Sequence, residues 1–145
     1  MTKFILLSIS IIALFILYPI DVFGCSCRAD SPNLNLKQLI KKAKKNSRAV
    51  FEGEVIKVEG GLPDSLTAIA TLRVKNSWKG VNTSIVIVSA SVCPYWLKVG
   101  KNYLIYAYGT NKDNLIVHSC SRTKEVNEAI DELTLLGKGK IIKQN

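Results

Sequence analysis

The stretch Leu66-Thr-Ala-Ile-Ala-Thr-Leu-Arg-Val-Lys-Asn-Ser-Trp78 has an apolar residue at every second position from Ala68 to Val74. Successive side chains of a β-strand point to opposite faces of the sheet, so a period of two is typical of a strand with one face in a core. Lys79-Gly80 then ends the pattern with a turn signal. The stretch therefore predicts one long, half-buried strand.

Four further segments predict strands around this one. They are rich in β-branched and apolar side chains, and polar or Gly-rich turns separate them. Gly53 interrupts the first segment, which indicates a bulge or a close approach of another backbone. The last two segments face each other across the polar turn 110–114. The segments are residues 48–58, 84–91, 102–108 and 115–120.

Apolar residues at helical spacing predict a helix at each end of the strand region. Ser31-Pro32-Asn33 is a start signal for the first helix, Thr123 caps the second, and Gly137 ends it. Five strands with a helix at each end favour a mainly β fold: a closed or nearly closed, five-stranded antiparallel barrel with flanking α-helices. The apolar positions are Leu36, Leu39, Ile40 and Ala43 in the first helix, and Val126, Ala129, Ile130, Leu133 and Leu136 in the second.

Residues 1–24 have the features of a secretory signal peptide. Lys3 precedes an apolar run over residues 4–20, and Val22 and Gly24 occupy the −3 and −1 positions of a cleavage site. We therefore expect an exported protein, secreted or periplasmic, that begins at the next residue after cleavage.

Cleavage leaves residues 25–145 as one domain whose first residue is Cys25. Two alternatives stay open. The apolar run remains as a membrane anchor, although it is short for a span of about 20 residues. In the other alternative Cys25 is lipidated, because Val22-Phe23-Gly24-Cys25 loosely resembles a lipobox, although this would leave an odd number of cysteines.

Four cysteines in an exported chain predict two disulfides. A bridge between Cys25 and Cys27 would close a strained small ring, so each of them is expected to pair with Cys93 or Cys120, in either order. In an extended segment both thiols would face the protein body and Ser26 would face away. A soft metal ion bound by reduced cysteines is the less favoured alternative.

The chain carries a formal net charge of +9, and much of the excess lies in two groups of basic residues. One interpretation is a solvated surface, and the other is attraction to an anionic surface or an acidic polysaccharide. No base-reading motif is found, so no nucleic-acid partner is expected. The groups are Lys37, Lys41, Lys42, Lys44, Lys45 and Arg48, and Lys138, Lys140 and Lys143.

The sequence does not predict an enzyme. The one histidine, His118, lies on a predicted strand, where a packed or surface histidine is expected rather than a general base. A Gly-rich phosphate loop, a paired carboxylate motif and a nucleophile elbow are all missing from the sequence. We therefore expect a binding protein without a cofactor.

Several segments together resemble the N-terminal, netrin-like domain of the tissue inhibitors of metalloproteinases. The resemblance covers most of residues 25–145. It implies an OB-fold barrel with Cys25 bonded to Cys93 and Cys27 bonded to Cys120. The segments are Cys25-Ser26-Cys27, Ser91-Val92-Cys93, Tyr103-Leu104-Ile105-Tyr106-Ala107 and residues 115–120.

The resemblance also implies an inhibitor of zinc metalloendopeptidases. The α-amine and carbonyl oxygen of Cys25 would chelate the catalytic zinc of the protease, Ser26 would enter its specificity pocket, and Ser91 and Val92 would pack alongside with Cys27 and Cys93. Two alternatives stay open: a secreted or surface-attached binding module in which the terminus is only structural, and a lipid-anchored envelope protein.

Overall fold

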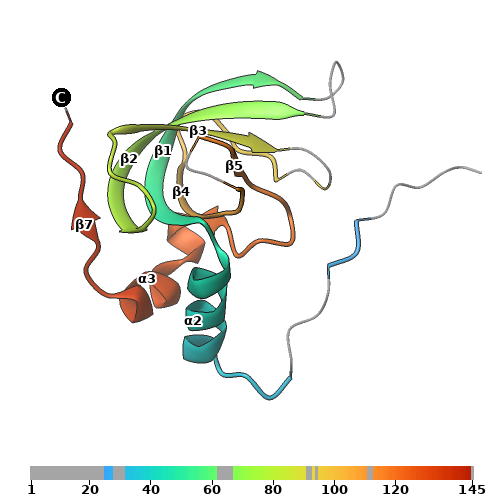
Figure 1. Cartoon of the computed structure of the whole chain (residues 1–145), viewed down its shortest axis with the longest axis vertical. Helices are drawn as coiled ribbons and strands as arrows, with labels where there is room; N and C mark the ends of the chain where they lie inside the picture. Colours follow the sequence, from blue (N-terminus) through green and yellow to red (C-terminus); the bar gives the residue numbers. More distant parts are fainter. Residues whose placement is uncertain are drawn as a thin grey trace, which may run out of the picture.

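A curled sheet and two helices make up the part of the chain that the computed structural model describes, which is residues 25–27, 32–61, 67–90, 93, 95–110 and 113–144 (Figure 1). The long strands are β1 (Ala49–Gly60), β2 (Ala68–Lys79), β3 (Ile85–Ala90) and β4 (Asn102–Ala107). The short strands are β5 (Leu115–Ile116), β6 (Lys124–Glu125) and β7 (Lys140–Ile141). The helices are α2 (Leu36–Asn46) and α3 (Ile130–Leu136), with a 3-10 turn at Val126–Glu128. The expected mainly β class is confirmed.

The sheet has the strand order β5-β3-β2-β1-β4-β6, and β7 pairs with β2. The expectation of a purely antiparallel sheet is wrong, because β5 runs parallel to β3, with Val88 opposite Leu115. The predicted β4–β5 hairpin is reduced to one bridge, in which Tyr108 and Ile116 exchange backbone hydrogen bonds of 2.9 and 2.8 Å. This bridge returns the backbone pairing from β5 to the end of β4, so the sheet curls into a half-barrel.

Strand β4 is buried on both faces, which explains its almost wholly apolar sequence. Tyr103 and Ile105 point into the main core with Phe51 of β1 and Leu72 of β2. The alternate residues Leu104 and Tyr106 form a second core together with Val50 and Ala129, against which Ala43 of α2 and Leu133 of α3 pack. The helices therefore cover the outer face of β1 and β4.

Gly53 lies both at an irregularity and at a close approach, as its position in the strand pattern predicts. The β1–β2 register shifts between Glu52 and Gly53. A Cβ atom on Gly53 would lie 3.1 Å from the carbonyl oxygen of Arg73, which is tighter than most real contacts. The long β1 strand bends at this point around the core.

Both helices begin later than the sequence predicts. The N-cap of α2 is Asn35, which forms a reciprocal capping box with Gln38, and Ser31 lies outside the described residues. The segment after Thr123 forms β6 and the 3-10 turn before α3 starts. The Thr123 hydroxyl accepts the N–H of Tyr106 at 3.0 Å, which holds this segment in extended form beside β4.

The predicted end of α3 is confirmed, because Gly137 has a φ of 70° and its N–H donates to Leu133 and Thr134. Ile130, expected in the core, is 63% exposed because it stands at the first position of the shortened helix. The predicted signal peptide, residues 1–24, lies outside the described residues. Within the described ranges, no helix is long and apolar enough to cross a membrane.

Candidate functional site

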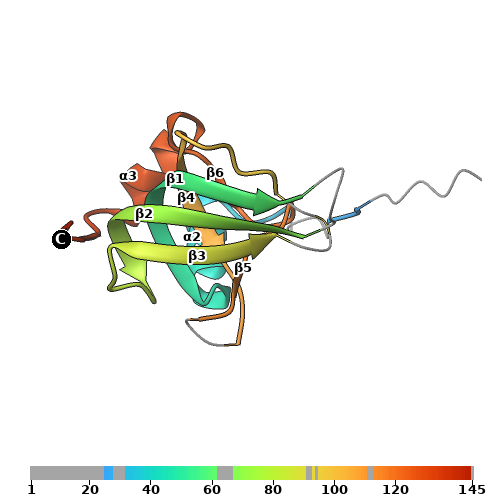
Figure 2. The same cartoon turned by 90° about the horizontal axis from the view of Figure 1, so that it is seen from above.

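Two disulfides fix the segment Cys25–Cys27 at one end of the curled sheet (Figure 2). Cys25 is bonded to Cys93 with a Cα–Cα distance of 5.5 Å, and Cys27 to Cys120 with one of 5.2 Å. The sequence left open which of Cys93 and Cys120 pairs with which N-terminal cysteine, and the structure has the pairing that the resemblance to the inhibitor family implies. The described part of the chain has no free cysteine.

Cys93 and Cys120 are brought together by the parallel pairing of β3 with β5. Beyond the two-residue ladder, the N–H of Val117 donates to the carbonyl of Ser89, and the N–H of Ser119 donates to that of Cys93, both at 2.8 Å. Ser89 and Cys93 therefore both lie beside the segment that follows β5. Cys93 itself has a φ of 60°, a left-handed conformation that is uncommon for a residue other than glycine.

All three residues of the Cys25–Cys27 segment are exposed to solvent. The bridges close loops with sequence separations of 68 and 93 residues. In the chain-entropy model, closing a loop of this size lowers the conformational entropy of the unfolded chain and so stabilises the fold by about 4 kcal/mol per bridge. The structure thus combines Cys25, Ser26 and Cys27 with Cys93 in one fixed, accessible unit, whereas Ser91 and Val92 lie outside the described residues.

The loop after Cys93 is anchored by aromatic contacts. Tyr95 packs edge-on against Tyr103, with ring centroids 6.0 Å apart, and the Tyr103 hydroxyl accepts the N–H of Lys98 at 3.2 Å. Burial raises the pKa of the Tyr103 phenol above its ordinary value of 10.0. Trp96 lies over Gly61 of the β1–β2 turn and stays 44% exposed.

His118 has a packed ring. It is half-buried and stacks on Tyr108, with ring centroids 4.9 Å apart and an angle of 24° between the planes. Among the described residues, no three His, Cys, Asp or Glu side chains gather in a way that could hold a metal ion.

A buried carboxylate on α3 is the most important contact that the sequence interpretation missed. The Glu132 side chain accepts hydrogen bonds from Tyr106 Oη at 3.1 Å, from Arg122 Nη2 at 2.6 Å and from Lys124 Nζ at 2.8 Å. Burial acts to raise the pKa of Glu132, but the hydrogen bonds and charges of Arg122 and Lys124 outweigh it and lower the pKa below its ordinary value. The cluster ties α3 to the segment that follows Cys120.

The sequence does contain a signal for this carboxylate. Ala129, Glu132, Leu133 and Leu136 share the helical spacing of a buried face, and an acidic residue at such a position indicates a partner inside the protein. The other missed contact is at the C-terminal end of α2, where Lys79 Nζ donates to the carbonyls of Lys44, Lys45 and Ser47 at 2.8, 2.9 and 2.6 Å.

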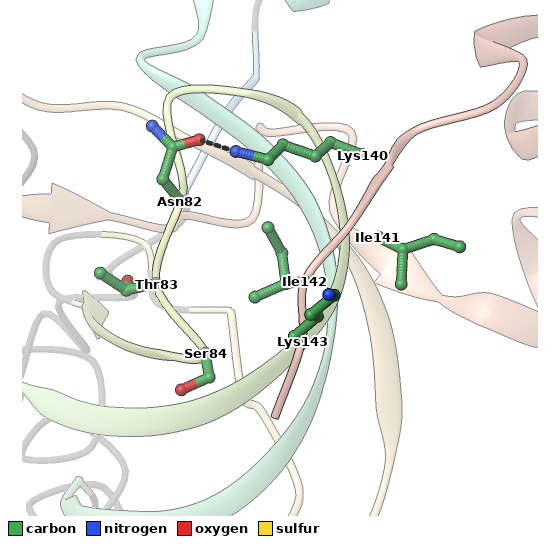
Figure 3. A pocket seen from close by; sticks show the side chains of 7 residues that line it. All are labelled: Asn82, Thr83, Ser84, Lys140, Ile141, Ile142 and Lys143. Carbon is green, nitrogen blue, oxygen red and sulfur yellow. Dashed lines mark hydrogen bonds between the residues drawn. The ribbon is translucent and has the colours of Figure 1, made fainter. Parts of the chain in front are cut away.

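A shallow groove lies near the C-terminal end of the described chain (Figure 3). The β2–β3 turn forms one wall, and the chain around β7 forms the other, where Lys140 Nζ donates to Asn82 Oδ1 at 3.2 Å. The floor is structural, because Ile142 is buried in the main core and its N–H donates to the Lys75 carbonyl at 2.9 Å. The lining residues are Asn82, Thr83, Ser84, Lys140, Ile141, Ile142 and Lys143.

The sequence matches no protein-family model and no curated protein. The function is therefore inferred from the residues and from the geometry that they form.

Proposed function

We propose that this chain is a secreted inhibitor of zinc metalloendopeptidases, built on a netrin-like domain with an OB-fold. The observation that carries the proposal is the exposed Cys25–Cys27 segment, which two disulfides hold beside the chain of Cys93 and Cys120. An inhibitor needs such a segment to be accessible to a partner and fixed in one conformation before binding.

The strand order supports the OB-fold part of the proposal. An OB-fold is a partly open, five-stranded barrel. Pairing here runs from β1 through β2 and β3 to β5 and returns to the end of β4 through the Tyr108–Ile116 bridge. The additional strands β6 and β7 have two residues each and lie at the margin of this ring.

The chemistry of a catalytic zinc site supports the inhibitory part. Such a zinc has three protein ligands and an open position that water usually fills. The α-amine and carbonyl oxygen of one residue can close a five-membered chelate ring on the metal and displace the water. Cys25 would supply both atoms after cleavage behind Gly24, and Ser26, between the two bridged cysteines, would project into the pocket beside the scissile position.

Rigidity is the advantage of the disulfides in this mechanism. A free N-terminus would lose its conformational freedom on binding, and this loss would weaken the complex. With Cys25 and Cys27 each bonded to the barrel, most of that entropy is already lost in the free protein. The two bridges also fit the oxidising extracellular or periplasmic location that the proposal requires.

The test compares two forms of the exported protein on a panel of zinc endopeptidases. One form begins at Cys25, verified by mass analysis of its N-terminus, and the other has a single alanine before Cys25. The extension removes the free amine from Cys25 and leaves the barrel unchanged, so we expect inhibition to weaken at least 100-fold. A form with one alanine added after Asn145 is the matched control and should inhibit like the first.

Equal inhibition by the first and the alanine-extended forms would rule out chelation by the amine. Failure of the first form to inhibit any enzyme of the panel would leave the segment with a structural role, as in a binding module.

A further inference from the structure

Helix α2 has five lysines among its eleven residues and no acidic side chain. Four of these lysines recur at intervals of three or four residues, so they lie along one side of the helix. We name them the lysine stripe: Lys37, Lys41, Lys44 and Lys45. At 1.5 Å per residue the stripe extends over about 12 Å.

The charges of the lysine stripe are not neutralised within the described part of the chain. The ion pairs there involve other lysines: Lys57 with Glu59, Lys101 with Glu125 and Lys124 with Glu132. Three stripe residues are exposed and Lys44 is partly so. The ammonium group of Lys79 lies at the C-terminal end of α2 and adds a positive charge beside Lys44 and Lys45.

The fold does not need the lysine stripe. The helix start is fixed by the capping box of Asn35 and Gln38, its end is fixed by Lys79, and Ile40 is its buried anchor. Like charges three or four residues apart repel each other and destabilise a helix. A row of lysine side chains that makes no ion pair within the described part of the chain indicates a role at the surface.

We propose that the lysine stripe binds a linear acidic polysaccharide. A row of cations about 12 Å long matches the repeated sulfates or carboxylates of such a chain, and the release of counterions drives binding of this kind. Insertion into a membrane surface is disfavoured, because Ile40 is buried and Leu39 and Ala43 are partly buried against the protein. Stacking on nucleic-acid bases is disfavoured, because α2 has no aromatic side chain.

This binding site is separate from the proposed inhibitory segment. Figure 1 shows α2 beside α3 below the sheet, whereas the Cys25–Cys27 segment, drawn in blue, lies to the right of the sheet and of both helices. A polysaccharide on α2 would therefore leave the N-terminal segment free, and either property can fail without the other. The form with an alanine before Cys25 should accordingly keep its full affinity for polysaccharide.

The probe is immobilised heparin, a sulfated polysaccharide, and the protein is the form that begins at Cys25. The stripe variant carries Lys37→Gln, Lys41→Gln, Lys44→Gln and Lys45→Gln. Its matched control carries the same loss of charge at exposed positions outside α2: Lys57→Gln, Lys75→Gln, Lys98→Gln and Lys101→Gln. Binding is measured as a function of salt for all three proteins.

We expect the stripe variant to lose at least tenfold in affinity at physiological salt, and the control variant less than threefold. The slope of log affinity against log salt should also fall by about one for each lysine that contacts the polyanion. Equal losses in both variants would show an effect of net charge alone and overturn the proposal. So would failure of the unmodified protein to bind heparin.

Two further measurements complete the test. Tighter binding to phosphatidylserine vesicles than to heparin would assign the stripe to a lipid surface and overturn the proposal. Thermal unfolding followed by circular dichroism shows whether the stripe variant is folded. If it is not, the single variants Lys41→Gln and Lys45→Gln are tested, and an unchanged affinity in both would overturn the proposal.

Discussion

Tyr106 and Glu132 form a buried hydrogen bond of 3.1 Å between the phenol on β4 and the carboxylate on α3. The same carboxylate forms ion pairs with Arg122 and Lys124. Since Arg122 follows Cys120 by two residues, the contact links the second disulfide to the helix that covers the sheet. One acidic side chain thus connects three parts of the fold.

Replacing this carboxylate should strongly destabilise the protein. In Glu132→Gln, the partly buried cations of Arg122 and Lys124 lose their counter-charge, and we expect the free energy of unfolding to fall by about 2–4 kcal/mol. Urea unfolding measures this change. The exposed Glu128 on the preceding turn is the control, and Glu128→Gln should change stability by less than about 0.5 kcal/mol. Equal effects would contradict the role of the cluster.

Acid should weaken the same cluster. The pKa of Glu132 in the folded protein lies below its ordinary value of 4.5, so its ionised form stabilises the fold above that pH. This contribution is lost as the pH falls through the lowered pKa, when the folded protein must also bind the proton. The stability difference between the unmodified protein and Glu132→Gln should therefore shrink from pH 6 to pH 3. Parallel stability curves over this range would refute the assignment.

Lys79 should stabilise the C-terminal end of α2. Lys79→Met keeps the apolar stem but removes the three hydrogen bonds to backbone carbonyls, and we expect a loss of about 1–3 kcal/mol. Hydrogen exchange should show faster opening of the last turn of α2, before global unfolding. The exposed Lys75, which donates to the side chain of Asn102, is the control, and its Met variant should leave exchange in α2 unchanged.

Gly109 should be required for closure of the sheet. Its φ is 139°, and a Cβ atom there would overlap the carbonyl oxygen of Asn114, next to the Tyr108–Ile116 bridge. Gly109→Ala should therefore cost at least about 2 kcal/mol. Gly100 also has a positive φ but has open space around its Cα, so Gly100→Ala should cost only about 1 kcal/mol. Thermal unfolding of the two variants gives the comparison, and the reverse order would contradict the structure.

Inhibition should depend on the protonation of the Cys25 amine. Only the unprotonated amine can bind zinc, and an α-amino group ordinarily loses its proton around pH 8. Affinity for a zinc endopeptidase should therefore fall by up to about tenfold per pH unit below that point. A hydroxamate inhibitor of the same enzyme serves as the control for the pH response of the protease. If affinity for the protein and for the hydroxamate changes in parallel, the amine is not a ligand.

The long strands could be predicted because their period is clear over many residues. Ala68 to Val74 shows every second side chain turned inward, and β1 to β4 appear close to their predicted positions. Of the short strands, β5 lies at the start of the predicted segment 115–120, whereas β6 and β7 could not be predicted, because two residues such as Lys124–Glu125 or Lys140–Ile141 have no period. Their pairing depends on contacts made elsewhere, such as the hydrogen bond between Thr123 and Tyr106.

The candidate site, like the fold, could be predicted only in part from the sequence. The cysteines and the predicted signal peptide predict two disulfides. The adjacency of Cys93 and Cys120, however, depends on the parallel pairing of β3 with β5, which no local sequence pattern predicts. The contact between Lys79 and the end of α2 could not be predicted either, because Lys79 lies 32 residues or more along the chain from the carbonyls that it contacts.

The last described residues affect how the protein can be handled. Ile142 is buried in the core, and Gln144 Nε2 donates to the carbonyl of Val74 at 2.6 Å, so the C-terminal segment is fastened to β2. Figure 2 shows this end of the chain and the Cys25–Cys27 segment at opposite ends of the molecule. A tag, a bead or a fused domain attached behind Gln144 would therefore hold the protein with its cysteine segment directed toward the solution, in the orientation needed to capture binding partners from an extract.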